Sequence, residues 1–186
     1  METLKRVYLG IDQFSEYCGR AVSWLVLVMT LLIAYDVIMR YAFRSGSVAM
    51  QELEWHLFSI IFLLGAAYTL KHHAHVCVDI LAQRQWMTKM RRAWIYLLCT
   101  LFFLLPFCVL VIYSSWDYVA NSYQILPHGE RSPDPGGLPY RYLIKGVIPL
   151  AFAFLLLQGI SLALRSLAVV LGDEAALPNP DHKEEL

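Results

Sequence analysis

The longest uncharged stretch of the chain is Ala93–Trp116, AWIYLLCTLFFLLPFCVLVIYSSW. It is longer than the roughly 20 residues that a helix needs to cross the hydrocarbon core of a bilayer. The stretch lacks the alternation of apolar and polar residues that marks a barrel strand. A helix satisfies its own backbone hydrogen bonds inside lipid, so the stretch predicts a membrane-spanning helix.

Three further apolar blocks surround this one. The whole chain of 186 residues is 58% hydrophobic and only 16% charged, which is more apolar and less charged than a soluble domain of this size. The sequence therefore predicts an all-α integral membrane protein, with one four-helix domain over residues 1–172. The expected transmembrane spans are residues 21–40, 53–71, 93–116 and 146–165.

The segments outside the spans have their own patterns. Residues 1–14, METLKRVYLGIDQF, lack the apolar core of a signal peptide. Their apolar side chains share one helical face, which predicts an N-terminal helix on the membrane surface; the alternative is a frayed polar leader. The face consists of Leu4, Val7, Tyr8, Ile11 and Phe14. Residues 173–186 are acidic and contain proline, which predicts a disordered tail.

The connection between the second and third spans begins with KHHAHVCVDIL, residues 71–81. Three histidines and Cys77 raise the possibility of a zinc site, but their spacing matches no common one and no second ligand pair is evident. Haem is disfavoured because the third and fourth spans contain no histidine. The mixed apolar and basic residues that follow predict an interfacial elbow, in which His75 and Asp79 are polar anchors.

Basic residues set the expected orientation. Ten lysines and arginines lie on the side of the N-terminus and five on the other. Because basic residues favour the cytoplasmic side, both termini are expected in the cytoplasm. No cysteine then lies in an external loop, so no disulfide is expected. The formal net charge of zero does not indicate nucleic-acid binding.

The third helix is expected to continue to Tyr123, which gives about 46 Å from Ala93 against a hydrocarbon core of about 30 Å. Pro106 is expected to kink it. Residues 124–142, QILPHGERSPDPGGLPYRY, contain four prolines and cannot form a regular helix or strand. They predict a shaped external loop, which is either a docking surface or a plain connector.

Charged residues cluster at the outer ends of the first two spans. Asp36 and Arg40 are four residues apart and can pair, and Arg40 or Arg44 could reach Glu52 or Glu54. The cluster fits either ion coupling or, better, an interfacial set of salt bridges that fixes helix pairing. Gly65 is expected to allow close helix contact, and Gln158 to hydrogen-bond a neighbouring helix within the membrane.

Taken together, these motifs resemble the small membrane subunit (DctQ type) of tripartite ATP-independent periplasmic (TRAP) transporters, over roughly residues 15–170. The resemblance depends on the order and spacing of short motifs, each of them weak alone. They are DVIMRY at 36–41, Glu52–Trp55, Gly65 with Tyr68–Leu70, HVCVD at 75–79 and SPDPGGLP at 132–139.

The resemblance implies a subunit of a secondary transporter in the bacterial inner membrane. A large membrane subunit (DctM type) would carry the substrate and sodium sites, and a periplasmic binding protein (DctP type) would deliver an organic acid. The small subunit is then no enzyme, holds no cofactor, contacts membrane lipid and acts as a scaffold. Expected helix or subunit contacts are Asp36, Arg40, Glu52, Glu54, Gly65, His75, Asp79 and Gln158; expected docking residues are Arg131, Asp134, Gly136, Gly137 and Arg141.

Two rival functions remain at this point. A self-sufficient, proton-coupled four-helix transporter needs a carboxylate near mid-span, and Asp36, the one candidate, lies near a span end and close to Arg40. A cytochrome-type membrane anchor would bind haem, which an absorbance spectrum would detect.

Overall fold

The computed structural model describes residues 2–72, 88–125, 129–173 and 176. Its helices are α1 (Glu2–Ala42), α2 (Val48–Lys71), α4 (Lys89–Cys99), α5 (Leu105–Tyr123) and α6 (Tyr142–Val170), with a π-helical turn, η1 (Thr100–Leu104), between α4 and α5. The described residues contain no strand. The predicted all-α fold is confirmed.

Four helical segments are long and apolar enough to cross a membrane: α1, α2, the continuous run Lys89–Tyr123, and α6. Each of the four expected spans lies within one of them. Most of the predicted elbow, including His75 and Asp79, and almost all of the predicted tail lie outside the described residues, and the last elbow residues, from Lys89, form the start of α4.

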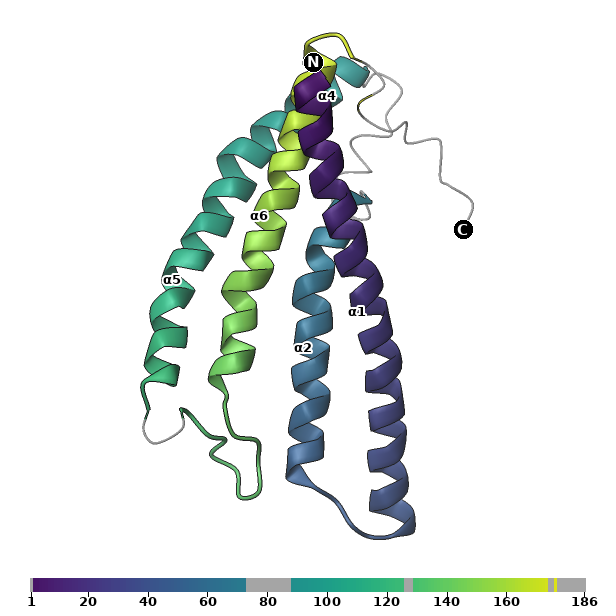
Figure 1. Ribbon diagram of the computed structural model, residues 1–186, viewed down its shortest axis with the longest axis vertical. Coiled ribbons are helices and arrows are strands. Elements are labelled where there is room, and N and C mark those ends of the chain that lie inside the picture. The colour runs from purple at the N-terminus through teal and green to yellow at the C-terminus, as the bar shows by residue number, and fades with distance from the viewer. Residues whose placement is uncertain (1, 73–87, 126–128, 174–175, 177–186) are drawn as a thin grey trace.

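Helix α6 lies at the centre of the bundle and packs against α1, α2, α4 and α5 (Figure 1). Its buried positions are mostly small, which allows close approach of neighbouring helices. They include Ala151, Gly159, Ser161, Ser166 and Ala168. A Cβ at Gly159 would lie 3.0 Å from a Leu104 methyl carbon, so η1 packs directly on this glycine. Small residues therefore explain why α6 is the common neighbour.

The expected N-terminal helix is present but is continuous with the span, because α1 runs without a break from Glu2 to Ala42, and its place on the membrane surface stays a prediction. Its 41 residues correspond to about 61 Å, twice the hydrocarbon core. Of the expected lipid-facing residues, Tyr8 is buried, and the ring of Phe14 packs edge-on against that of Phe154, 5.2 Å away. Packing against α6 therefore stabilises the N-terminal half of α1 as a continuation of the span.

The turn that precedes Pro106 is π-helical, and the kink expected at this proline stays a prediction. The N–H of Leu105 bonds to the carbonyl of Thr100, five residues back instead of four. Proline has no N–H and its ring clashes with the carbonyl four residues earlier, so a widened turn accommodates it without ending the helix. The segment from Lys89 to Tyr123 therefore remains one continuous helical unit.

Candidate functional site

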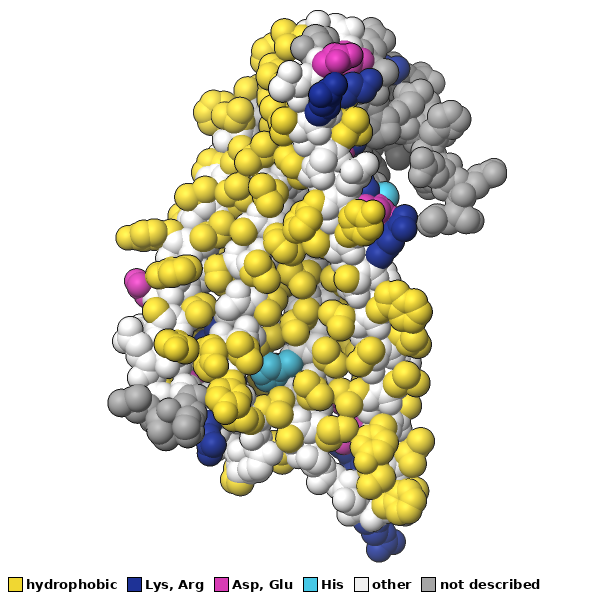
Figure 2. Space-filling model, in the orientation of Figure 1, with side chains coloured by type: hydrophobic (Ala, Val, Ile, Leu, Met, Phe, Trp, Pro, Cys, Tyr) yellow, Lys and Arg dark blue, Asp and Glu magenta, His cyan; other side chains and the backbone are white. Residues whose placement is uncertain are grey.

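Polar side chains gather at two ends of the bundle. The terminal end holds the start of α1 and the end of α6, and the loop end holds residues 43–47 and the α5–α6 loop. Hydrophobic side chains cover most of the face between them (Figure 2). The two polar ends are therefore where charged side chains make specific contacts.

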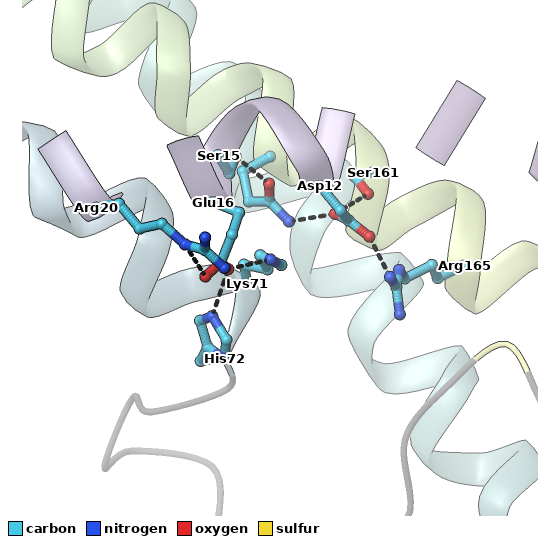
Figure 3. Close-up of polar contacts among 9 residues, drawn as sticks. Asp12, Ser15, Glu16, Arg20, Lys71, His72, Ser161 and Arg165 are labelled. Atoms are coloured by element: carbon cyan, nitrogen blue, oxygen red, sulfur yellow. Dashed lines mark hydrogen bonds and ion pairs between the residues drawn. The ribbon is translucent and has the colours of Figure 1, made fainter. Parts of the chain in front are cut away.

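At the terminal end, Asp12 of α1 meets three side chains of α6 (Figure 3). Its Oδ1 accepts from Gln158 Nε2 at 2.9 Å and from Ser161 Oγ at 2.7 Å, and its Oδ2 pairs with Arg165. Ser15 Oγ donates to Gln158 Oε1 at 2.6 Å. We call these five residues the Asp12 network.

The Asp12 network is buried. Asp12 is only 4% exposed, and Ser161 is completely buried. The Arg165 guanidinium lies 5.0 Å from the centre of the Tyr8 ring, which adds a cation–π contact. Because a buried carboxylate is costly unless it is paired and hydrogen-bonded, these contacts compensate the charge and fix how α1 and α6 are rotated against each other.

One turn further along α1, Glu16 joins α1 to the end of α2. Its carboxylate accepts from Lys71 Nζ at 2.5 Å and from His72 Nε2 at 3.3 Å, and Arg20 Nε lies 3.4 Å away (Figure 3). Near this contact, Gly19 packs directly against the Tyr68 ring, which a Cβ would overlap. The end of α2 is thus held by both an ion pair and a close helix contact.

At the loop end, Glu52 of α2 holds the α5–α6 loop. Its carboxylate accepts from Ser132 Oγ and, at 2.6 Å, from the backbone N–H of Leu138, and Glu52 is only 4% exposed. A Cβ at Gly137 would lie 2.9 Å from Glu52 Oε1 and 2.5 Å from Ser132 Cβ, so a glycine is required there. We call Glu52, Ser132 and Leu138 the carboxylate clamp.

The clamped loop has a defined turn at its tip. The N–H of Gly137 bonds to the Asp134 carbonyl at 3.0 Å, and Gly136 has φ +82°. Proline followed by a glycine of positive φ is the signature of a type II turn. The N–H of Ser132 bonds to the Leu138 carbonyl at 3.1 Å and closes the base. The loop is therefore a preformed projection.

A second carboxylate fixes the same loop to α5 and α6. Glu130 pairs with Lys145, accepts from Ser122 Oγ at 2.7 Å, and lies 3.9 Å from Arg141. The hydrogen bond from Lys145, and then that from Ser122, lowers the pKa of Glu130 below its ordinary value of 4.5. Glu52 therefore binds the tip of the loop to α2, and Glu130 binds its base to α5 and α6.

The lowered pKa of Glu130 predicts a pH-dependent loop. A depressed carboxyl pKa contributes stability above the unfolded value, and this stability is lost as the pH falls through the folded value. Amide exchange in residues 129–131 and 141–145, corrected for its intrinsic pH dependence, should accelerate in mild acid. Glu130→Gln should reduce protection at neutral pH and flatten this dependence. An unchanged profile in Glu130→Gln would contradict the assignment.

The charged residues at the ends of α1 and α2 make one expected contact and one that was not expected. Asp36 and Arg40 form the ion pair. Arg40 also faces the side-chain amide of Gln51. With the amide oxygen turned toward Arg40, it accepts from the guanidinium Nη2 at 2.5 Å and Nη1 at 2.8 Å. The expected bridge from Arg40 or Arg44 to Glu52 or Glu54 is not found among the described residues, because the clamp occupies Glu52.

Of the other predicted contact residues, one makes its contact within the chain and two do not. Gln158 bonds a neighbouring helix as expected. Gly65 makes no close contact within the described chain, since a Cβ there would have no heavy atom within 4 Å, and the nearby Ala67 is buried instead. Glu54 Oε1 is buried without a hydrogen-bond partner among the described residues. For Gly65 and Glu54, contact with another subunit stays a prediction.

The predicted docking residues lie on or beside the clamped loop. Arg131 and Asp134 are exposed, as is Gly136 at the turn. Gly137 packs inward on the clamp, and Arg141 faces Glu130. Only the first three are therefore free to meet another molecule, while Gly137 and Arg141 hold the loop in shape.

Sequence reasoning did not find the Asp12 network, apart from Gln158, or the ion pairs of Glu16 and Glu130. A signal was present: Asp12 and Ser15 share a helical face, and so do Gln158, Ser161 and Arg165. In the described part of the chain no three His, Cys, Asp or Glu residues come together as a potential metal site. His73, His75 and Cys77 lie outside it, and Cys18, Cys99 and Cys108 are free thiols.

Comparison with known proteins identifies the family. Residues 29–169 match the model of the DctQ component of tripartite ATP-independent periplasmic transporters. The chain is 30% identical over 113 residues to the C4-dicarboxylate TRAP transporter small permease protein DctQ of Vibrio cholerae serotype O1, covering 61% of this chain and 46% of that protein. It is 28% identical over 97 residues to a putative TRAP transporter small permease protein of Haemophilus influenzae, covering 50% and 55%.

The chain thus spans about half the length of each of these two relatives. No solved structure matches it. The family match covers most of the chain and agrees with four apolar helices of spanning length. The chain therefore belongs to the DctQ family of TRAP transporters, as a small permease subunit that crosses the inner membrane several times.

Proposed function

We propose that this subunit is a non-catalytic scaffold in a secondary TRAP transporter. It would hold a large DctM-type membrane subunit in place and help dock a periplasmic DctP-type binding protein, for sodium-coupled uptake of an organic acid. Both termini would lie in the cytoplasm. The Vibrio cholerae relative is named for C4-dicarboxylates, and we extend only the class of organic acid to this chain.

The observation that carries this proposal is the clamped loop. It is a rigid projection between α5 and α6, with Arg131 and Asp134 exposed beside a type II turn. A preformed loop loses little conformational entropy on binding, which favours docking of a soluble partner. On the positive-inside orientation, this loop faces the periplasm, where the binding protein is expected.

The pairing of Asp12 and Asp36 supports a scaffold over a self-sufficient transporter. A small proton-coupled transporter needs an ionisable group that can take up and release its proton within the span. Asp36 is paired with Arg40, and Asp12 with Arg165. The sodium and substrate sites are accordingly assigned to the large subunit, and this subunit needs no cofactor of its own.

Reconstituted uptake tests the proposal. Liposomes with both membrane subunits and added binding protein should accumulate the organic acid under a sodium gradient, whereas liposomes with the small subunit alone should not. The two membrane subunits should co-purify. Accumulation by the small subunit alone would refute the proposal.

Charge reversal at the loop tests docking separately. Arg131→Glu with Asp134→Arg should lower uptake about tenfold, as expected for loss of about 1.4 kcal/mol of binding energy, with co-purification unchanged. Glu2→Lys, at a highly exposed position at the start of α1 and at the opposite end of the bundle from the loop, is the matched control. Unchanged uptake in the loop variant would remove the docking role and leave the scaffold role.

A further inference from the structure

Helix α5 lies at the edge of the bundle and has one packed and one open side. In Figure 1 it borders α6, and α6 is its main contact among the other helices. Cys108, Ser115 and Ser122 are buried on its packed side. The described part of the chain does not cover the opposite side, which is therefore available to lipid, water or another protein.

Exposed residues recur along this open side at alternating intervals of three and four. They are Leu110, Ser114, Asp117 and Asn121, which we call the α5 seam. Such spacing keeps one line of side chains facing a neighbouring helix over several turns, as in coiled coils and many membrane bundles. The spacing alone fits packing against another helix.

The α5 seam is mixed in composition, because Leu110 lies inside the expected span 93–116 and Asp117 and Asn121 lie just beyond its end. Asp117 forms no ion pair or hydrogen bond with any other described residue. At the end of the span, a cation can stabilise this unpaired carboxylate. Beside it, Tyr113 is 83% exposed, Trp116 67% and Leu110 63%. An apolar groove lined by Val109, Ile112, Tyr113 and Trp116 runs beside the seam.

A protein surface that is apolar but carries a positive charge would satisfy both halves of the seam. The exposed side chains of α1 fit lipid better, since Leu27, Leu31 and Ile38 are apolar and the acid on that span, Asp36, is already paired. Charge complementarity therefore favours α5 over α1 as the face for a partner helix.

We propose that the α5 seam is where a membrane helix of the large subunit packs, with a lysine or arginine of that helix opposite Asp117. This inference rests on the proposed function and adds the face and the chemistry of the contact. Apolar residues of the partner helix cover Leu110, and its cation compensates the carboxylate.

Photo-crosslinking tests the face. A benzophenone amino acid is placed at Leu110 or Tyr113 on α5, and, as a control of comparable exposure, at Leu31 on α1. In the co-expressed complex, the α5 positions should crosslink to the large subunit and the control should not. Crosslinks from the control alone, or lipid adducts alone at α5, would overturn the inference while co-purification still supports the proposed function. Failure of the subunits to co-purify would overturn both.

Charge reversal tests the partner's chemistry. Asp117→Lys should reduce the large subunit recovered with the tagged small subunit about tenfold, since like charges then face each other. Asp117→Asn should reduce it less, and Glu2→Lys not at all. Size-exclusion profiles of the isolated variants check that they remain folded. Full recovery with Asp117→Lys would show that no cation faces this position and would overturn the proposal.

Discussion

Replacing Arg165 by alanine is expected to destabilise the bundle by about 3 kcal/mol, because it leaves the Asp12 carboxylate buried without its cation. The Asp12 side chain is 6% exposed, and its other contacts, Gln158 and Ser161, cannot neutralise its charge. Thermal unfolding of the purified subunit in detergent measures the loss.

The exposed pair Arg6–Glu2 on the same α1 helix provides the control. Its two side chains are 84% and 91% exposed and 3.9 Å apart, so Arg6→Ala should change the stability only slightly. A combined Asp12→Asn and Arg165→Met variant should recover much of the loss, because it removes both charges. Equal unfolding temperatures for Arg165→Ala and Arg6→Ala would show that the Asp12 network does not hold α1 to α6.

The second large effect is expected at Gly19. A side chain there would overlap the Tyr68 ring, so Gly19→Leu must push α1 and α2 apart at the level of the Glu16–Lys71 ion pair. Overpacking of this kind costs about 1–3 kcal/mol. Loss of the close contact should appear as a lower unfolding temperature and faster amide exchange at the end of α2.

Gly10 is the matched position for this test. It lies on the same helix, and a Cβ there would have no heavy atom within 4 Å. Gly10→Leu should be neutral or stabilising, because leucine has a higher helix propensity than glycine by up to about 1 kcal/mol. If both leucine variants behaved alike, the close contact between α1 and α2 would be refuted.

The sequence by itself determined the number and approximate position of the spans. Apolar blocks of about 20 residues are a direct consequence of bilayer thickness, and no tertiary contact is needed to read them. It also marked Pro106 as a place where a helical hydrogen bond is lost, since the missing N–H acts within one helix. The loop over residues 124–142 was readable because its prolines and glycines are incompatible with a regular helix or strand, whereas the turn at Asp134–Gly137 was found only in the structure. The continuity of α1 was not readable, because packing against α6 lies outside local pattern.

The tertiary structure alone decided which charged groups meet. Asp12 pairs with Arg165, 153 positions away, and Glu52 binds Ser132, 80 positions away. Hydropathy fixes that a helix crosses the membrane, but it does not fix the helix's rotation about its axis or its depth relative to its neighbours. Those two quantities determine which polar side chains reach one another, and they follow from how α1, α2 and the loop pack around α6.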